Sequence, residues 1–200
     1  MDNTVERLTQ FQKYVIEGSI LGDGYLRIVK GRSNAFLEVN HSYNAKDYVD
    51  WKYSVLRNIV KSPPKMRKGN GARLAYRFFT RQHPQITELF RKFYVKREKI
   101  IPQDLVLDPL ALAVWYMDDG SKCGENDFYL NTQQFSFDGQ KKLIAYLERM
   151  GLQTTPQKDK TYYRLRFLKS SVPVLKKVIH KYIVPSMEYK LSLESVETTR

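Results

Sequence analysis

Cysteine and histidine are scarce in this chain of 200 residues. Cys123 is the only cysteine, which excludes an internal disulfide and a zinc site built from several thiolates, and favours a reducing compartment. The three histidines, His41, His83 and His180, are far apart in the sequence and form no closely spaced pair of ligands. We therefore expect no metal site centred on histidine.

Long apolar stretches and targeting segments are also missing. No run approaches the roughly 20 apolar residues of a membrane-spanning helix. The N-terminal segment MDNTVERLTQ contains acids, and it lacks both the apolar region of a signal peptide and the composition of a transit peptide. We therefore expect no membrane partner. The sequence leaves a mitochondrial, plastid or prokaryotic cytoplasmic location open.

Acidic residues are outnumbered by basic ones. The chain has 34 Lys and Arg against 21 Asp and Glu, a formal net charge of +13. This excess favours a polyanionic partner, with nucleic acid first and an anionic membrane second. Charge alone does not separate an enzyme from a general basic RNA-binding protein.

One nine-residue pattern occurs twice, about half the chain apart. Residues 16–24 read IEGSILGDG and residues 112–120 read LAVWYMDDG; each is an apolar, helix-like run that ends in Asp-Gly. The flanks repeat too, in the order helix, strands, helix, strands, helix. The pattern predicts strands at 25–30, 35–41, 72–81, 127–136 and 161–169, and helices at 46–60, 84–96, 138–150 and 171–184. We expect Ser171 to cap the last helix, with Pro173 in its first turn.

Acids at the carboxyl end of a helix oppose the helix dipole, so Asp23, Asp118 and Asp119 require an explanation. One interpretation is that they are solvated loop residues after a helix stop. Because the pattern is duplicated, we instead expect the two helices to lie side by side and to bring Asp23 close to Asp119. Glycines at 18 and 22 would permit a close approach. Adjacent carboxylates repel unless a proton or a cation lies between them, and oxygen ligands favour Mg²⁺.

Polar side chains alternate along the predicted strands and would share faces suited to phosphates and base edges. A half-exposed sheet shows the same alternation without a ligand. In the first hairpin we expect Arg27 on one face and Glu38 with Asn40 on another. The candidates for nucleic-acid contact are Arg27, Lys30, Glu38 and Asn40 in the first hairpin, Arg73, Arg77 and Arg81 in strand 72–81, Asn131 and Gln133 in strand 127–136, and Arg164 and Arg166 in strand 161–169.

The two nine-residue patterns resemble the paired motifs of the LAGLIDADG homing endonuclease family, in its single-chain form. The likeness extends over essentially the whole chain. It includes SPPK at 62–65, KIIPQDL at 99–105, LAVWYMDDGSK at 112–122, LNTQQFSF at 130–137 and EYKL at 188–191. The sequence departs from the motif at Glu17, Val114 and Asp118, where smaller residues are usual, and keeps both terminal acids.

The resemblance implies an α+β fold of two pseudo-symmetric αββαββα units, residues 1–103 and 104–200, with antiparallel saddle-shaped sheets and a central interface of two helices. It implies a monomeric, site-specific endonuclease of intron homing. Such an enzyme makes a double-strand break in a long DNA target by metal-dependent hydrolysis and leaves short 3′ overhangs. An RNA maturase and a non-cleaving DNA-binding regulator on the same scaffold are the alternatives.

The resemblance also assigns roles to individual residues. Carried over by position, the ligands of Mg²⁺, with Mn²⁺ as a substitute, are Asp23, Asp119 and the backbone oxygens of Gly22 and Asp118. Lys99 and Lys190 match catalytic basic residues placed near the attacking water. These lysines stand at different places in the two halves, so the two sites could be inequivalent. Loss of the acids would have favoured a maturase, and both acids are present; the acids together with both lysines argue against the non-cleaving regulator.

Overall fold

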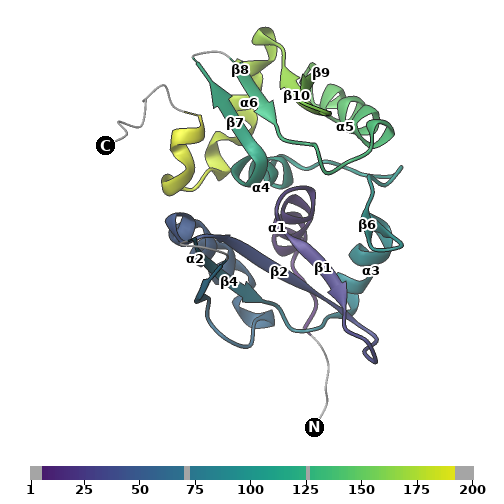
Figure 1. Ribbon diagram of the computed structural model, residues 1–200, viewed down its shortest axis with the longest axis vertical. Helices are drawn as coiled ribbons and strands as arrows, with labels where there is room; N and C mark the ends of the chain where they lie inside the picture. Colours follow the sequence, from purple (N-terminus) through teal and green to yellow (C-terminus); the bar gives the residue numbers. More distant parts are fainter. Residues whose placement is uncertain (1–5, 70–72, 125–126, 192–200) are drawn as a thin grey trace. The chain divides into compact units, whose positions relative to one another are not determined.

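A computed structural model describes residues 6–69, 73–124 and 127–191. The chain divides into two compact units, residues 1–99 (the first unit) and 100–200 (the second unit), and each is described by itself (Figure 1). Within the described ranges, no helix has both the length and the apolar character needed to cross a membrane.

The first unit has one antiparallel sheet of four strands in the order β1-β2-β4-β3. Its elements are α1 (Gln10–Leu21), β1 (Tyr25–Ile28), β2 (Ala35–Ser42), α2 (Lys46–Leu56), β3 (Lys65–Lys68), β4 (Leu74–Phe79) and α3 (Pro84–Phe93), followed by the short hairpin β5 (Tyr94–Val95) and β6 (Glu98–Lys99). A capping box starts α1, because the backbone N–H and side chain of Thr9 exchange hydrogen bonds with Gln12 at 3.0 and 3.1 Å.

The second unit repeats this plan, with strand order β7-β8-β10-β9. Its elements are α4 (Pro109–Asp119), β7 (Gly120–Cys123), β8 (Asp127–Leu130), α5 (Phe137–Arg149), β9 (Thr154–Asp159), β10 (Tyr162–Phe167) and α6 (Val172–Ile179). Asp108 caps α4 by accepting from the N–H of Leu110 at 2.8 Å, and Pro109 occupies the first turn. Both units thus have the order αββαββα, and the predicted α+β class with two repeated units is confirmed.

Each sheet has an apolar face covered by helices and a polar face. In the first unit, Leu26, Leu37 and Phe78 are buried, and α2 and α3 pack on the sheet. In the second unit, Phe128 and Leu165 are buried and α5 packs on the sheet. Since side chains alternate along a strand, the opposite face of each sheet presents polar residues.

Several predicted boundaries differ from the structure. The predicted strand 127–136 ends at Leu130, and the helices expected to reach residues 60 and 96 end at Leu56 and Phe93. Strands β3 and β9 were not expected from the sequence; their residues KMRK and TTPQKD have no apolar alternation, and they form by pairing with β4 and β10. Residue 72 of the predicted strand 72–81 lies outside the described residues.

Ser171 occupies the N-cap position of the last helix, as predicted, but its side chain does not cap the helix. Ser171 already has helical backbone angles, and its hydroxyl accepts from the N–H of Gln153 at 2.8 Å instead of capping α6. Pro173 does lie in the first turn of α6, as expected. That the two helices at 16–24 and 112–120 lie side by side stays a prediction.

Candidate metal sites and nucleic-acid interface

In each unit, a glycine lies at the tight turn between the motif helix and the first strand. The N–H of Gly24 donates to the carbonyl of Ser19 at 2.7 Å, and the N–H of Gly120 donates to the carbonyl of Tyr116. An added Cβ would lie 2.6 Å from the Ser19 oxygen at position 24, and 2.3 Å from the Tyr116 oxygen at position 120. Only glycine fits at these positions. The preceding aspartate is therefore held at the helix end.

The two motif acids have different neighbours. Oδ2 of Asp23 lies 3.4 Å from Nδ1 of His41 on β2, and the Asp23 side chain is half exposed. Oδ2 of Asp119 accepts from Nε2 of Gln134 at 3.2 Å. Sequence reasoning missed His41 and Gln134, because only the sheet register and the turn after β8 bring them to the acids.

The two lysines make matching contacts. Nζ of Lys99 donates to the carbonyl of Gly22 at 2.7 Å, and Nζ of Lys190 donates to the carbonyls of Met117 at 2.6 Å and Asp118 at 3.0 Å. Gly22 and Asp118 each directly precede a motif acid. The last carbonyls of a helix lack intrahelical donors, and a cation there complements the helix dipole. Each lysine thus caps its helix and places positive charge beside the acid.

Buried tyrosines hold the segments that carry these lysines. In the first unit, Tyr94 pairs with Lys99 across the β5–β6 hairpin, and its hydroxyl accepts from the N–H of Leu26 at 3.0 Å. In the second unit, the hydroxyl of Tyr116 donates to the carbonyl of Lys190 at 3.1 Å. Burial raises the pKa of Tyr94 to about 12 and also raises the pKa of Tyr116, so both hydroxyls stay protonated at neutral pH.

The donor set at each helix end fits a hard divalent cation. Each end offers the carboxylate of its motif acid, Asp23 or Asp119, and the carbonyl that precedes it. Oxygen donors of this kind suit Mg²⁺, which commonly takes one or two carboxylates and completes its shell with water and substrate phosphates. No group of three or more His, Cys, Asp or Glu in the described part of the chain could form a self-contained site. A cation here would complete its shell with water or with phosphate oxygens of a substrate.

The polar face of the first sheet gathers cations from three of its strands, β1, β3 and β4. We call it the unit-1 face; it comprises Tyr25, Arg27, Phe36, Glu38, Asn40, Lys65, Arg67, Ala75, Arg77 and Phe79. The prediction that Arg27 and Glu38 occupy different faces is wrong. The register pairs Arg27 with Phe36, two residues before Glu38, and Nη2 of Arg27 lies 3.9 Å from Oε2 of Glu38.

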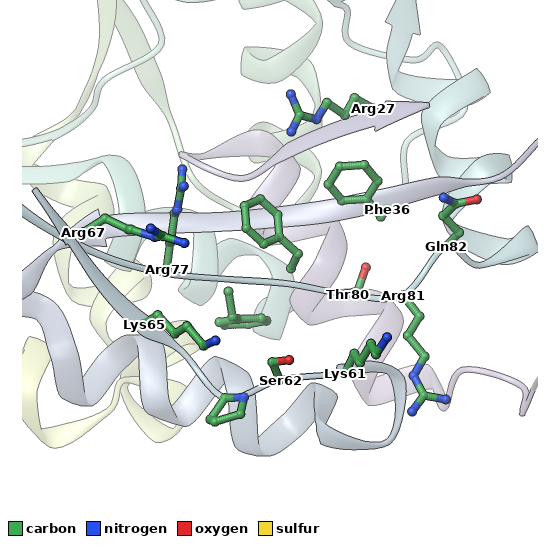
Figure 2. A pocket seen from close by; sticks show the side chains of 13 residues that line it. Arg27, Phe36, Lys61, Ser62, Lys65, Arg67, Arg77, Thr80, Arg81 and Gln82 are labelled. Atoms are coloured by element: carbon green, nitrogen blue, oxygen red, sulfur yellow. The ribbon is translucent and has the colours of Figure 1, made fainter. Parts of the chain in front are cut away.

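A pocket of about 560 Å³ opens on the unit-1 face (Figure 2). Arg27 and Arg77 line it from their strands, and the predicted Arg81 lines it from the loop after β4. Lys61, Lys65 and Arg67 also line it and were missed from the sequence. Of the remaining candidates in this unit, Asn40 lies opposite Arg77 on the face, while exposed Lys30 and Arg73 lie just outside β1 and β4.

The polar face of the second sheet is called the unit-2 face and comprises Ser121, Cys123, Asp127, Tyr129, Thr155, Gln157, Asp159, Tyr162, Arg164 and Arg166. Arg164 and Arg166 share this face with Tyr162, as expected. Nε and Nη2 of Arg166 donate to Oδ1 of Asp127 at 3.1 and 2.5 Å, and these bonds raise the pKa of Arg166. The guanidinium of Arg164 lies 4.0 Å from the ring centroid of Tyr129.

Asn131 and Gln133 do not occupy a strand, so their predicted shared strand face is wrong. Strand β8 ends at Leu130, and residues 131–136 form the loop that leads into α5. Nε2 of Gln133 donates to Oδ2 of Asp159 at 3.0 Å, and Nδ2 of Asn131 donates to the hydroxyl of Ser121 at 3.5 Å. Both amides therefore border the unit-2 face through partners on it.

Comparison with known proteins gives consistent matches. A family model described as the LAGLIDADG DNA endonuclease family matches residues 13–175. Cytochrome b mRNA maturase bI2 of Debaryomyces hansenii is 31% identical over 186 residues, which cover 87% of this chain and 71% of the relative. Probable intron-encoded endonuclease 1 of Wickerhamomyces canadensis is 30% identical over 199 residues, which cover 92% of this chain and 85% of the relative. The chain spans about half the length of several other curated relatives it matches.

A solved structure is similar over nearly the whole chain. The homing endonuclease I-WcaI bound to its DNA recognition sequence superposes with a TM-score of 0.87 at 27% sequence identity. The match covers 96% of this chain and 90% of I-WcaI.

Proposed function

The chain belongs to the LAGLIDADG DNA endonuclease family, and on that premise we propose that it is a site-specific homing endonuclease. The proposed reaction is hydrolysis of one phosphodiester bond in each strand of a long double-stranded DNA target, leaving short 3′ overhangs. One observation carries the proposal: in both units, a lysine Nζ bonds the carbonyl next to the motif acid. A helix end that served only as a structural junction would not need an acid and a lysine together in both units.

Asp23 and Asp119, with the carbonyls of Gly22 and Asp118, would hold divalent cations, which we propose to be Mg²⁺. When bound, such a cation stabilises negative charge on the oxygens of the phosphate that is cleaved. Through the bound cation, the carboxylates would orient the phosphate and keep it at the helix end. The charge of the bound ion would offset the unfavourable placement of acids at a helix C-terminus.

Lys99 and Lys190 would act on the phosphate side of each site. An ammonium group has three N–H donors, and the helix carbonyls fix the position of each lysine. The fixed positive charge would offset the phosphate charge and orient a water molecule by hydrogen bonding. In the first unit, His41 lies beside Asp23 and would help to set the direction of that carboxylate.

The two polar sheet faces supply the proposed DNA interface. The unit-1 face carries Arg27, Lys65, Arg67 and Arg77 against one acid, Glu38, which suits a phosphate-lined groove. A β-sheet can lie in the major groove, where base edges are distinguishable. The likeness to a DNA-bound homing endonuclease supports the same use in this chain.

The direct test is cleavage of a randomised double-stranded DNA library in Mg²⁺, with the cut ends sequenced. We expect one long preferred site, cut by the wild type and not by Asp119→Asn. No cutting in Mg²⁺ or Mn²⁺, combined with salt-sensitive binding, would contradict the nuclease proposal. Equal cutting by Asp119→Asn would contradict the assigned site.

A second candidate function is RNA maturation, because a relative that is 31% identical is named as an mRNA maturase. The same chain would then assist the splicing of its intron RNA. An intron splicing assay in vitro tests this, with Asp119→Asn as the matched variant. Splicing that persists in Asp119→Asn, beside absent DNA cleavage by the wild type, would favour the maturase.

A further inference from the structure

On the unit-1 face, one carboxylate lies between two arginines. Oε1 of Glu38 is 3.6 Å from Nη1 of Arg77, and Oε2 is 3.9 Å from Nη2 of Arg27. The Glu38 side chain is 19% exposed, whereas those of Arg27 and Arg77 are 52% and 34% exposed. The acid therefore lies deeper than the two guanidinium groups that it attracts.

Each arginine also lies over a phenylalanine. Cζ of Arg27 is 5.2 Å from the ring centroid of Phe36, and Cζ of Arg77 is 5.3 Å from that of Phe79. The two rings pack edge to face, with their centroids 5.9 Å apart. Figure 2 shows Arg27, Phe36 and Arg77 on neighbouring strands of this face. The result is a nearly symmetric cluster in which one acid and two rings fix two arginines.

We infer that Glu38 is a positioning residue that presents Arg27 and Arg77 to two guanines of the DNA target; this rests on the proposed function. Distances of 3.6 and 3.9 Å are too long for hydrogen bonds, so the acid restrains the arginines without occupying their N–H donors. The planar fork of arginine matches the O6 and N7 acceptors of guanine in the major groove. A fork that is already oriented loses less side-chain entropy on binding.

The neighbouring cations on the face lack this restraint. Lys65 and Arg67 on β3 are exposed, and no acid lies within ion-pair distance of either among residues 6–69, 73–124 and 127–191. Flexible cations of this kind suit phosphates, which carry no sequence information. The cluster and β3 thus divide the face into a base-reading part and a phosphate-binding part.

The second unit offers a contrasting arginine. Arg166 donates from both Nε and Nη2 to Asp127, so two donors of its fork are already used. Three N–H donors of Arg166 remain, so this pair does not by itself exclude contact with a base. The two clusters differ in that Asp127 holds one arginine through two hydrogen bonds, whereas Glu38 lies near two arginines and forms no hydrogen bond with either.

The test is selection of bound duplexes from a randomised DNA library in EDTA, which prevents metal-dependent cutting, followed by sequencing. The full-length wild type is compared with Arg27→Ala, Arg77→Ala, Glu38→Gln and the control Lys65→Ala. We expect two guanine positions in the wild-type site. Arg77→Ala should reduce the preference for guanine at one position and Arg27→Ala at the other, each by about tenfold.

Glu38→Gln separates positioning from simple charge. Removal of an acid should raise affinity for unselected DNA, while the preference at both guanine positions should fall by about threefold to tenfold. Lys65→Ala should weaken all sequences alike and leave the base preferences unchanged. Thermal melting of each variant identifies loss of folding, and Arg77→Lys provides a second variant that retains the charge but not the fork.

Two other results would overturn the inference. Arginine variants that weaken every sequence equally, or preferred bases other than guanine at the affected positions, would reject base reading by this cluster while leaving the proposed function intact. A wild type that selects no sequence at all would reject the proposed function itself.

Discussion

The two units have the same element order and strand order, but they position their candidate active-site residues with different parts. Lys99 comes from a hairpin held by Tyr94, whereas Lys190 follows Pro185 in a short 3₁₀ segment held by Tyr116. Both reach the carbonyl that precedes a motif acid. The comparison teaches that matching chemistry can be supported by unmatched sequence. The two lysines therefore look inequivalent in the sequence and equivalent in their contacts.

The largest expected effect comes from the motif acids. Asp23→Asn and Asp119→Asn should each reduce double-strand cleavage by roughly 10³-fold or more, because loss of a metal ligand removes several kcal/mol of charge stabilisation. The measurement is cleavage of a supercoiled plasmid that carries the selected site, with linear and nicked products separated. Filter binding in EDTA is the control and should change little.

Nicking sharpens the comparison of the two units. If each unit serves one strand, the two variants should nick opposite strands, which sequencing of the nicked product would reveal. Nicks on the same strand in both variants would show that the units do not divide the strands between them.

The lysines should have the next largest effect, and it should be similar in both units. Lys99→Met and Lys190→Met should each slow cleavage by roughly 10²-fold, as expected for the loss of one fixed donor beside developing charge. If each lysine only capped its helix, its substitution would lower the free energy of unfolding by about 0.3–1 kcal/mol and leave the cleavage rate unchanged. Single-turnover cleavage and urea unfolding on the same proteins distinguish the two roles.

Substitution of the turn glycines Gly24 and Gly120 should lower the stability of the fold. Gly24→Ala and Gly120→Ala each place a Cβ less than 3 Å from a backbone carbonyl, so the turn must shift. We expect a loss of roughly 2–4 kcal/mol in the free energy of unfolding, measured by urea denaturation. Gly31→Ala is the matched control for an exposed turn glycine, although its positive φ of 79° adds its own smaller strain. Equal losses at all three positions would contradict the close-approach explanation.

The αββαββα order was implied by the family resemblance, whereas periodicity and the repeated motif predicted only the order helix, strands, helix, strands, helix and missed β3 and β9. They could not give the sheet register. The number of residues in the loop after β1 sets which residues of β1 and β2 are paired. A shift of one residue moves a side chain to the other face of the sheet, which is why Arg27 was wrongly predicted to lie on a different face from Glu38. Strand β3 was missed because KMRK has a single apolar residue and no alternating pattern, and the strand forms by pairing with β4. Lys65 and Arg67 were missed with it.

The site was predicted where its residues are adjacent to a motif and missed where tertiary contacts supply them. Asp23 and Asp119 follow from the sequence pattern. His41 and Gln134 reach these acids only through the fold, and neither has a distinctive sequence context. Single-sequence patterns record local geometry, whereas these contacts depend on how distant segments pack.

The smallest expected effect compares the two polar faces. The logarithm of the DNA-binding constant falls linearly with the logarithm of salt concentration. Lys65→Ala should reduce the steepness of this fall by about 0.9, the value for one lost phosphate contact. Arg166→Ala should lower it by less, because Asp127 already offsets the charge of Arg166. Fluorescence anisotropy of a labelled duplex across a series of KCl concentrations measures both slopes. Asp127→Asn supplies the matched control: it should raise the slope, since it releases Arg166 for phosphate. An equal drop in Lys65→Ala and Arg166→Ala would show that the Arg166–Asp127 pair opens on DNA, and the two faces would then contribute alike.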